Sequence, residues 1–295
     1  MSTLSDSMQA GNAGREPSSS RAVDHRLTVP VTLRTLTRMM RQKEPIACLT
    51  CYDATTARWL ERAGIPVLLV GDSAAQVILG FDQPIHAPLD FMLHITAAVK
   101  RGAPNCFVMG DMPFMSYQAD DAEAIRNAGR FLTEGLADAV KLEVDETYAE
   151  LVHKLDRAGI PVVAHIGWRP QRARHDGVRT ALVAGRTQAE VDRLVLQAVR
   201  LAEAGAVMLL VEQTTAEVSQ RIVEKVSIPV IGCGGGPACH GHIVVLQDLL
   251  GLTAWQPSFA QPVTSLGEAL CAAAVRWKEK VQNRDMGEHP YRMSD

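Results

Sequence analysis

From residue 46 onward, short apolar runs alternate with longer stretches that mix apolar and polar positions. A short run of consecutive apolar residues is typical of a strand that is buried on both faces. The pattern predicts eight such strands, at Ile46–Cys51, Pro66–Gly71, Cys106–Gly110, Ala139–Glu143, Pro161–His165, Val207–Glu212, Pro229–Gly232 and, most weakly, Leu252–Trp255.

The stretches between these runs predict amphipathic helices. Thr55–Ala63 and Thr147–Ala158 place apolar residues at intervals of three and four, and glycines such as Gly64, Gly159 and Gly205 end several helices just before a strand. Buried strands joined by helices form parallel sheets, and eight such units fit one (β/α)8 TIM barrel. A doubly wound sheet is the alternative, but residues 48–53 lack the glycine-rich first turn that such sheets often carry.

The barrel is expected to occupy residues 30–295 as a single domain that ends in an amphipathic helix at Leu266–Val281. That helix would pack on a neighbouring subunit or cap its own barrel. Residues 1–29 are rich in serine, glycine and charge and contain no apolar segment. This composition predicts a disordered tail rather than a targeting segment.

Composition narrows the class of protein. The chain has 295 residues, of which 47% are hydrophobic, so it can bury a large core. Its net charge of −3 and the absence of a basic stripe argue against nucleic acid as a partner. The apolar runs are too short to span a bilayer, and six scattered cysteines favour a reducing cytoplasm over a secreted disulfide framework.

Two groups of cysteines are candidate sites. Cys48 and Cys51 form a C-x-x-C, but they lie in a predicted strand with side chains on opposite faces, which favours ordinary packing. Cys233, Cys239, His240 and His242 lie around the glycines at 234–236, in a spacing that fits no common zinc pattern. The glycines follow the seventh strand, where barrels often bind anions, so an anion site is an open alternative there.

Ionisable residues gather where the predicted strands end, which is where barrel enzymes keep their chemistry. They are Asp72 with Ser73, Asp111, Lys141 with Glu143, His165 and Glu212. On the fourth strand, the alternation of side chains puts Lys141 and Glu143 together on the face opposite to the apolar residues, which points them into the barrel.

Buried charges need partners, because an isolated one is very costly. Asp72, Asp111 and Glu143 would repel one another without a cation, and an all-oxygen set of ligands suits Mg²⁺. The competing interpretation is structural: Asp72 or Asp111 could cap a helix, and Glu143 could pair with Lys141 alone. His165 fits a hydrogen-bonded core histidine better than a catalyst, whereas Glu212 is a candidate proton carrier with a raised pKa.

At these same residues the sequence resembles the ketopantoate hydroxymethyltransferase (3-methyl-2-oxobutanoate hydroxymethyltransferase) family, over roughly residues 31–260. The matching stretches are Leu49–Asp53, Val70–Ser73, Arg101–Pro104, Gly110–Phe114, Val140–Glu143, His165–Gly167 with Pro170 and Gln171, Glu212, and Ile228–Gly232. In this order they are far more specific together than any one of them alone.

The resemblance implies a homo-oligomeric barrel of the phosphoenolpyruvate mutase and isocitrate lyase type. Its reaction would use Mg²⁺ and transfer a one-carbon unit from 5,10-methylenetetrahydrofolate to 3-methyl-2-oxobutanoate. The metal positions match Asp72, Asp111 and Glu143, and the contacts to the oxo acid match Asp72, Ser73, Asp111 and Lys141. Glu212 matches the proton acceptor, and Lys141 would add positive charge where negative charge develops.

The sequence departs from the family pattern in loops at 74–88, 168–185 and 233–242. These loops would shape the substrate pockets rather than the metal site, so a related 2-oxo acid is a candidate substrate. A carbon–carbon lyase or phosphonate-type mutase on the same metal-enolate platform is the alternative reaction. A non-catalytic scaffold is a third hypothesis, against which the intact set of ionisable residues argues.

Overall fold

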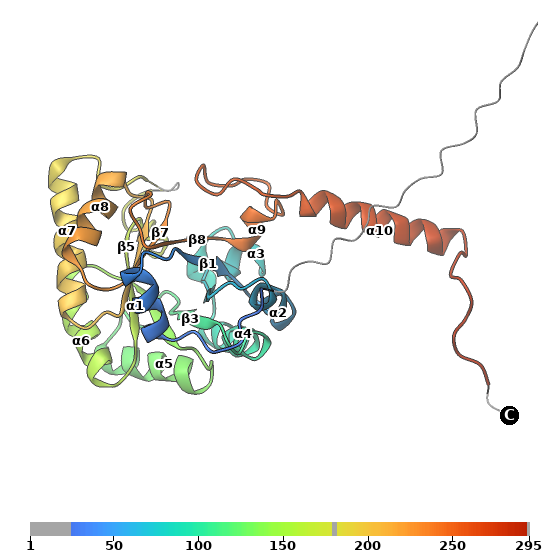
Figure 1. Ribbon diagram of the computed structural model, residues 1–295, viewed down its shortest axis with the longest axis horizontal. Helices are drawn as coiled ribbons and strands as arrows, with labels where there is room; N and C mark the ends of the chain where they lie inside the picture. The colour runs from blue at the N-terminus through green and yellow to red at the C-terminus, as the bar shows by residue number, and fades with distance from the viewer. Residues whose placement is uncertain (1–24, 179–181, 294–295) are drawn as a thin grey trace, which may run out of the picture.

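The computed structural model describes residues 25–178 and 182–293, and its centre is a closed barrel of eight parallel strands (Figure 1). Each strand pairs with the next along the chain, and β8 closes the barrel on β1. The strands are β1 Ile46–Thr50, β2 Val67–Val70, β3 Phe107–Asp111, β4 Ala139–Glu143, β5 Val162–Gly167, β6 Met208–Glu212, β7 Val230–Cys233 and β8 Gly241–Val244. The predicted (β/α)8 barrel is confirmed, and the doubly wound alternative is excluded.

Helices surround the barrel and connect the successive strands, except that a loop without a helix joins β7 to β8. The α-helices are α1 Leu33–Arg41, α2 Ala54–Arg62, α3 Ala74–Val77, α4 Leu89–Gly102, α5 Asp121–Thr133, α6 Ala149–Arg157, α7 Gln188–Glu203, α8 Ala216–Lys225, α9 Leu246–Leu249 and α10 Leu266–Gln282. Short 3-10 helices lie at η1 Pro84–His86, η2 Glu146–Tyr148 and η3 Pro170–Arg172. The third of these carries a residue that matters for the site.

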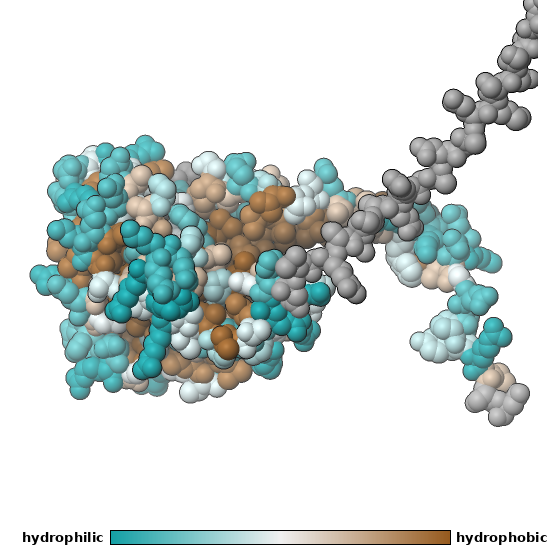
Figure 2. All heavy atoms as spheres, viewed as in Figure 1, coloured by the Kyte–Doolittle hydropathy of each residue, from teal (hydrophilic) through white to brown (hydrophobic). Residues whose placement is uncertain are grey.

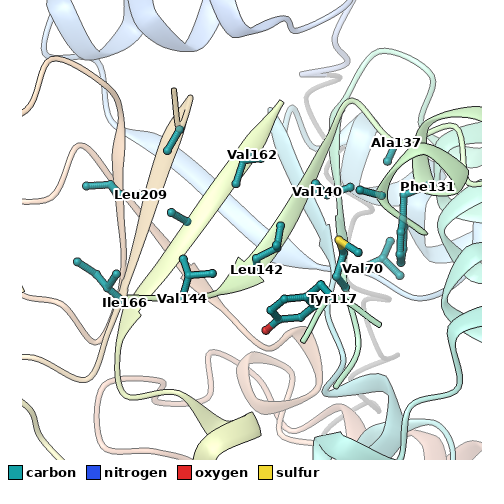
Figure 3. Close-up of a cluster of buried hydrophobic side chains, with 14 of the residues drawn as sticks. Val70, Tyr117, Phe131, Ala137, Val140, Leu142, Val144, Val162, Ile166 and Leu209 are labelled. Carbon is teal, nitrogen blue, oxygen red and sulfur yellow. The ribbon is translucent and has the colours of Figure 1, made fainter. Parts of the chain in front are cut away.

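Two hydrophobic clusters follow from the alternation of side chains along each strand. On β2, Val67 and Leu69 point into the barrel, whereas Leu68 and Val70 pack outward against the helices. Figure 3 shows part of the outer cluster, including Val70, Leu142 on β4 and the ring of Tyr117. Apolar side chains therefore cover both faces of β2 to β7, as their continuous apolar sequences predict.

The eighth strand is the one element that the pattern placed wrongly. We expected it at Leu252–Trp255, but those residues follow α9 in a loop, where Trp255 is 73% exposed. The strand is Gly241–Val244, which pairs with β7 and β1. Its sequence contains glycine and histidine, and a Cβ at Gly241 would lie 2.1 Å from the backbone oxygen of Ile46. The close approach of β1 requires glycine here, and glycine weakens the apolar signal of a strand.

The N-terminal end of the barrel is closed by apolar side chains. Val31 and Leu36, from α1 and the segment before it, join the inner cluster, and Leu36 is fully buried. Of the predicted tail, residues 1–24 lie outside the described part of the chain. Leu27 packs against the clusters, and its backbone N–H donates to the oxygen of Glu61 at 3.4 Å.

The C-terminal helix α10 extends away from the barrel instead of capping it (Figure 1). None of its residues is buried against the described part of the chain, although it carries large apolar side chains. Figure 2 shows hydrophobic atoms gathered where this helix leaves the barrel. No helix within the described ranges has the length and apolar character needed to cross a membrane.

Candidate active site

The C-terminal end of the barrel interior is lined with ionisable side chains. On β3, β4, β5 and β6 these side chains continue the inner face that Met109, Ala139, Val163 and Leu210 occupy lower in the barrel. Strand register then pairs them across neighbouring strands: Asp111 lies opposite Lys141, Glu143 opposite His165, and Glu212 opposite Cys233. On β4, Ala139 lies in the inner hydrophobic cluster and Val140 and Leu142 lie in the outer one, so the alternation confirms that Lys141 and Glu143 point into the barrel. Each of the two is 4% exposed.

Asp72 and Ser73 follow β2 without acting as helix caps. Ser73 occupies the N-cap position of α3 but makes no side-chain capping bond within the described residues, and it shares a 2.8 Å hydrogen bond with the hydroxyl of Tyr52. The backbone N–H of Asp72 donates to Oδ2 of Asp111 at 3.0 Å, which ties the ends of β2 and β3 together. By contrast, Asp53 after β1 is an ordinary cap that accepts from two backbone N–H groups of α2.

Lys141 and Asp111 form a buried ion pair. The ammonium Nζ donates to both carboxylate oxygens of Asp111 at 2.8 Å, and the two side chains are 5% and 1% exposed. Burial opposes the charge of Lys141, but Asp111, Asp72 and Glu143 outweigh it and raise the pKa of the amine. Lys141 therefore keeps a positive charge beside the carboxylates.

His165 lies between two carboxyl groups. Its Nδ1 is 3.8 Å from Oε1 of Glu143, and its Nε2 is 3.4 Å from Oε2 of Glu212. Burial, reinforced by Lys141, lowers the pKa of His165 well below its usual value, so the ring is neutral. Neither ring nitrogen makes a hydrogen bond of good geometry with another described residue, although the nearby backbone of Trp168 favours the charged form of the ring.

The two glutamates flanking His165 are also perturbed. Burial raises the pKa of Glu143 well above its usual value, against the opposing charge of Lys141. Burial likewise raises the pKa of Glu212 to about 8, against the opposing charge of Lys141 and, more weakly, a hydrogen bond from Cys233. Glu212 keeps 18% of its side chain exposed, so a small molecule can reach it. A carboxyl group with such a pKa can take up and release a proton near neutral pH.

The cysteine pair at β1 and the histidine and glycines after β7 have structural explanations. Cys48 packs inside the barrel and Cys51 outside it, as their opposite faces predicted, and all six cysteines are free. His240 accepts a 3.0 Å hydrogen bond from the backbone N–H of Val230. A Cβ at any of the glycines at 234–236 would lie within 3.0 Å of Phe259, of Val211 or of Ala216, so close packing accounts for that run.

Sequence reasoning missed Gln171, which is 4% exposed and lies among the carboxylates. β5 ends at Gly167, whose φ of +91° and whose approach to the backbone of Glu212 leave no room for a side chain. Arg169 then donates to Asp145 at 2.8 Å, which anchors the loop on the segment after β4. These contacts place Gln171 beside Glu143 and Asp72. In the sequence, only the Pro-Gln pair of the family pattern pointed to this residue.

A cavity of about 280 Å³ opens beside this network. Glu143, Tyr117 and Gln171 form its inner wall, and its outer wall combines aromatic and basic side chains. The remaining lining residues are Ile85, Phe114, Gln118, Tyr148, Arg172, Arg174 and His175.

The carboxylates meet some requirements of a divalent metal site. The possible ligands are oxygens, and Oε1 of Glu143 is buried with no hydrogen-bond partner among the described residues. Three acidic groups, Asp72, Asp111 and Glu143, face the one ammonium of Lys141, and added positive charge would favour the ionised form of Glu143, whose pKa burial raises. As the side chains lie, however, the described residues hold no group of three histidine, cysteine or acidic side chains placed to bind one metal ion. The arrangement therefore fits a hard cation such as Mg²⁺ that uses one or two carboxylates and completes its shell with water and substrate oxygens.

Comparison with known proteins identifies the family of this chain. The protein-family model for ketopantoate hydroxymethyltransferase matches residues 30–289. The 3-methyl-2-oxobutanoate hydroxymethyltransferase of Hyperthermus butylicus is 41% identical over 88% of this chain and 90% of its own length. That of Trichodesmium erythraeum is 40% identical over 88% and 98%.

Among solved structures, the fold resembles that of 2,3-dimethylmalate lyase, a member of the PEP mutase/isocitrate lyase superfamily, with a TM-score of 0.55 and 17% identity over 90% of each chain. Identity this low shows the fold alone. The match to the family model over most of the barrel and the relatives near 40% identity go further: the chain belongs to the ketopantoate hydroxymethyltransferase family.

Proposed function

We propose that this protein is a metal-dependent hydroxymethyltransferase that adds a one-carbon unit from 5,10-methylenetetrahydrofolate to C3 of 3-methyl-2-oxobutanoate or a related 2-oxo acid. One observation carries the proposal. Buried carboxylates and the charged Lys141 meet at the C-terminal end of the barrel, and Glu212 with its raised pKa lies across His165 from Glu143.

Asp72, Asp111 and Glu143 are the residues that would hold the cation, with at most two of them in direct contact in the present arrangement. A divalent cation bound there supplies Lewis-acid polarisation of the carboxylate and keto oxygens of a 2-oxo acid. Lys141 adds fixed positive charge at the same end of the barrel, and Ser73 lies beside Asp72 with a hydroxyl group for the substrate.

Glu212 is the proposed proton acceptor. It removes the proton from C3, and negative charge moves onto the keto oxygen, where the charge of Lys141 stabilises it. The methylene carbon of the folate bridges two nitrogens. C3 forms a bond to that carbon as its bond to one nitrogen breaks, and water then replaces the second nitrogen; the two nitrogens take up the proton removed from C3 and a proton from the water. Atom balance requires one water molecule for the new hydroxyl group, because the methylene bridge carries no oxygen.

The cavity beside Glu143 supports folate as the one-carbon donor. Phe114 and Tyr148 offer aromatic surface for a pterin ring, and Arg172 and Arg174 offer guanidinium groups for carboxylates such as those of a glutamyl tail. The cavity would enclose part of the donor, since its volume of about 280 Å³ is small for a whole ligand of this size.

Homo-oligomerisation is part of the proposal, with a second copy of the chain covering α10. Leu266, Leu270, Trp277 and Val281 recur at helical spacing along one side of this helix and are 39–63% exposed. An apolar stripe of this length is stable in water only when another surface covers it. Trp277→Glu should reduce the mass measured by light scattering. We also place the protein in the cytoplasm, which its free cysteines favour.

The test is proton exchange followed by NMR. Purified protein with Mg²⁺ and 3-methyl-2-oxobutanoate in D₂O should replace the proton at C3 by deuterium without folate, and should form product only when methylenetetrahydrofolate is added. Exchange without transfer would favour the lyase or mutase alternative. If no branched 2-oxo acid exchanges while Mg²⁺ binds, the proposed function is wrong.

Metal removal and one variant test the assignment of residues. A chelator should abolish exchange, and added Mg²⁺ should restore it. Asp111→Asn should lose metal-dependent exchange while its circular dichroism spectrum stays native, whereas Asp53→Asn, at a helix cap outside the site, should keep it. Exchange that survives in Asp111→Asn would contradict the assignment of Asp111 to the metal.

A further inference from the structure

Gln171 contacts two of the three carboxylates at once. Its backbone N–H donates to Oε2 of Glu143 at 2.9 Å, and its side-chain Nε2 donates to Oδ2 of Asp72 at 2.9 Å. The same Nε2 also donates to the backbone oxygen of Met112 at 3.1 Å. One residue from the loop after β5 therefore joins the ends of β2, β3 and β4.

The orientation of the Gln171 amide is determined by its neighbours. Oε1 accepts from the hydroxyl of Tyr117 at 2.8 Å and from Nε2 of Gln118 at 3.2 Å. The opposite orientation would place Oε1 against the carboxylate of Asp72, and the amide hydrogens against donors. All four hydrogen-bonding positions of the amide are used, so the side chain has one favourable orientation.

Tyr117 is itself held by the site. Its hydroxyl oxygen accepts from the backbone N–H of Glu143 at 3.1 Å, and its ring is 2% exposed in the outer hydrophobic cluster (Figure 3). The hydroxyl has a single proton and two possible acceptors. Oε1 of Gln171 at 2.8 Å is nearer than the backbone oxygen of Glu143 at 3.2 Å, so the hydroxyl donates to Gln171. The position of Glu143 thus determines the position of Tyr117, which in turn orients Gln171.

Gln171 binds one oxygen of each carboxyl group that it contacts and makes no hydrogen bond to the other. Gln171 engages Oε2 of Glu143, while Oε1 stays buried without a hydrogen-bond partner in the described part of the chain. An amide is neutral, so it holds both carboxylates without cancelling their charge. Lys141 does the opposite for Asp111, because it both binds that carboxylate and neutralises it.

We propose that Gln171, oriented by Tyr117, is a positioning residue that occupies one oxygen each of Glu143 and Asp72 and so presents their other oxygens to a divalent cation. This inference rests on the proposed function, since it assumes that a cation binds these carboxylates. Partners of this kind, one shell outside the metal, orient its ligands and reduce the entropy that the ligands lose on binding.

The test is Mn²⁺ binding to metal-free protein, measured by electron paramagnetic resonance without substrate. Gln171→Met keeps the length of the side chain and the backbone N–H but removes the side-chain donor, and it should weaken Mn²⁺ binding by about 10- to 100-fold. Tyr117→Phe removes only the hydroxyl and should weaken binding by about two- to tenfold. The matched control is Gln197→Leu, because Gln197 is a 5% exposed glutamine on α7 outside the site, and this variant should bind Mn²⁺ as the wild type does.

The outcomes separate the two proposals. Wild-type affinity in both Gln171→Met and Tyr117→Phe, even with a lower melting temperature, would overturn the positioning role and leave Gln171 as a loop anchor. If Gln171→Met does not fold, Tyr117→Phe decides alone. A wild-type protein that binds no Mn²⁺ and catalyses no exchange would instead overturn the proposed function.

Discussion

The two ends of the barrel interior differ in chemistry although the same strands build both. At the N-terminal end, Val31 and Leu36 close the barrel over apolar side chains such as Phe107. At the C-terminal end, the same inward-facing positions carry Asp111, Glu143 and other ionisable groups. The apolar end contributes stability, whereas the ionisable end holds charges whose burial is costly.

This difference shows how the fold separates stability from chemistry. Buried carboxylates with raised pKa values destabilise the folded chain, and the packed end offsets that cost. Variants at the two ends should therefore change different quantities. A substitution at the N-terminal end should lower the free energy of unfolding. A substitution at the C-terminal end should lower the rate of proton exchange.

The largest expected effect is that of Glu212→Gln on exchange. Removing the proton acceptor should slow C3 exchange by about 10²- to 10⁴-fold, the usual contribution of general-base catalysis. The folded-state pKa of about 8 lies above the ordinary value of 4.5, so ionising Glu212 at higher pH costs stability, and the variant should melt no lower than the wild type at pH 9. Glu203→Gln, at an exposed position on α7, is the control; near-normal exchange in Glu212→Gln would contradict the role of Glu212.

Leu36→Ala should lower stability and leave the exchange rate unchanged, whereas Glu212→Gln should lower the exchange rate. This fully buried side chain lies in the inner cluster, and its truncation should cost about 2–5 kcal/mol in the free energy of unfolding. Thermal and urea unfolding would measure the loss, with Leu196→Ala, at a 50% exposed position, expected to change it by less than about 0.5 kcal/mol. The exchange rate of the folded protein should stay near that of the wild type. A slower exchange rate with unchanged stability would contradict the separation of stability from chemistry between the two ends of the barrel.

The pH profile of exchange gives a third, smaller effect. Only the ionised form of Glu212 accepts a proton, so the rate should rise with pH, by up to about tenfold per unit, and reach half of its maximum at or below about pH 8. A bound cation would move the midpoint lower, because positive charge favours the carboxylate. A rate that falls as the pH rises from 6 to 8 would assign Glu212 a different role.

The smallest expected effect is that of Cys233→Ala. Cys233 donates a hydrogen bond to Glu212, which favours the carboxylate, so its loss should move the midpoint of the profile upward by less than about one pH unit. Cys239→Ala removes a thiol whose own hydrogen bonds lie elsewhere and should leave the midpoint unchanged. A downward shift in Cys233→Ala would contradict this account of the contact.

Much of the fold was predictable because the strands are buried on both faces and therefore read as apolar runs. The alternation on β4 correctly placed Lys141 and Glu143 inside the barrel. The eighth strand could not be predicted from its sequence, because Gly241 and His242 interrupt its apolar character. The more apolar Leu252–Trp255, where the strand was expected, lies in a loop. The choice of glycine at 241 depends on the approach of β1, a contact far away in the chain.

The sequence by itself determined the barrel, the inward face of its strands and the group of ionisable residues at their ends, because these follow from local periodicity and strand order. Only the tertiary structure decided how those residues meet. The structure placed His165, which the sequence favoured as a core residue, between Glu143 and Glu212, and it brought Gln171 into the site through a loop. Such contacts depend on strand register and on chain reversals such as that at Gly167, which bring together residues that no local pattern relates.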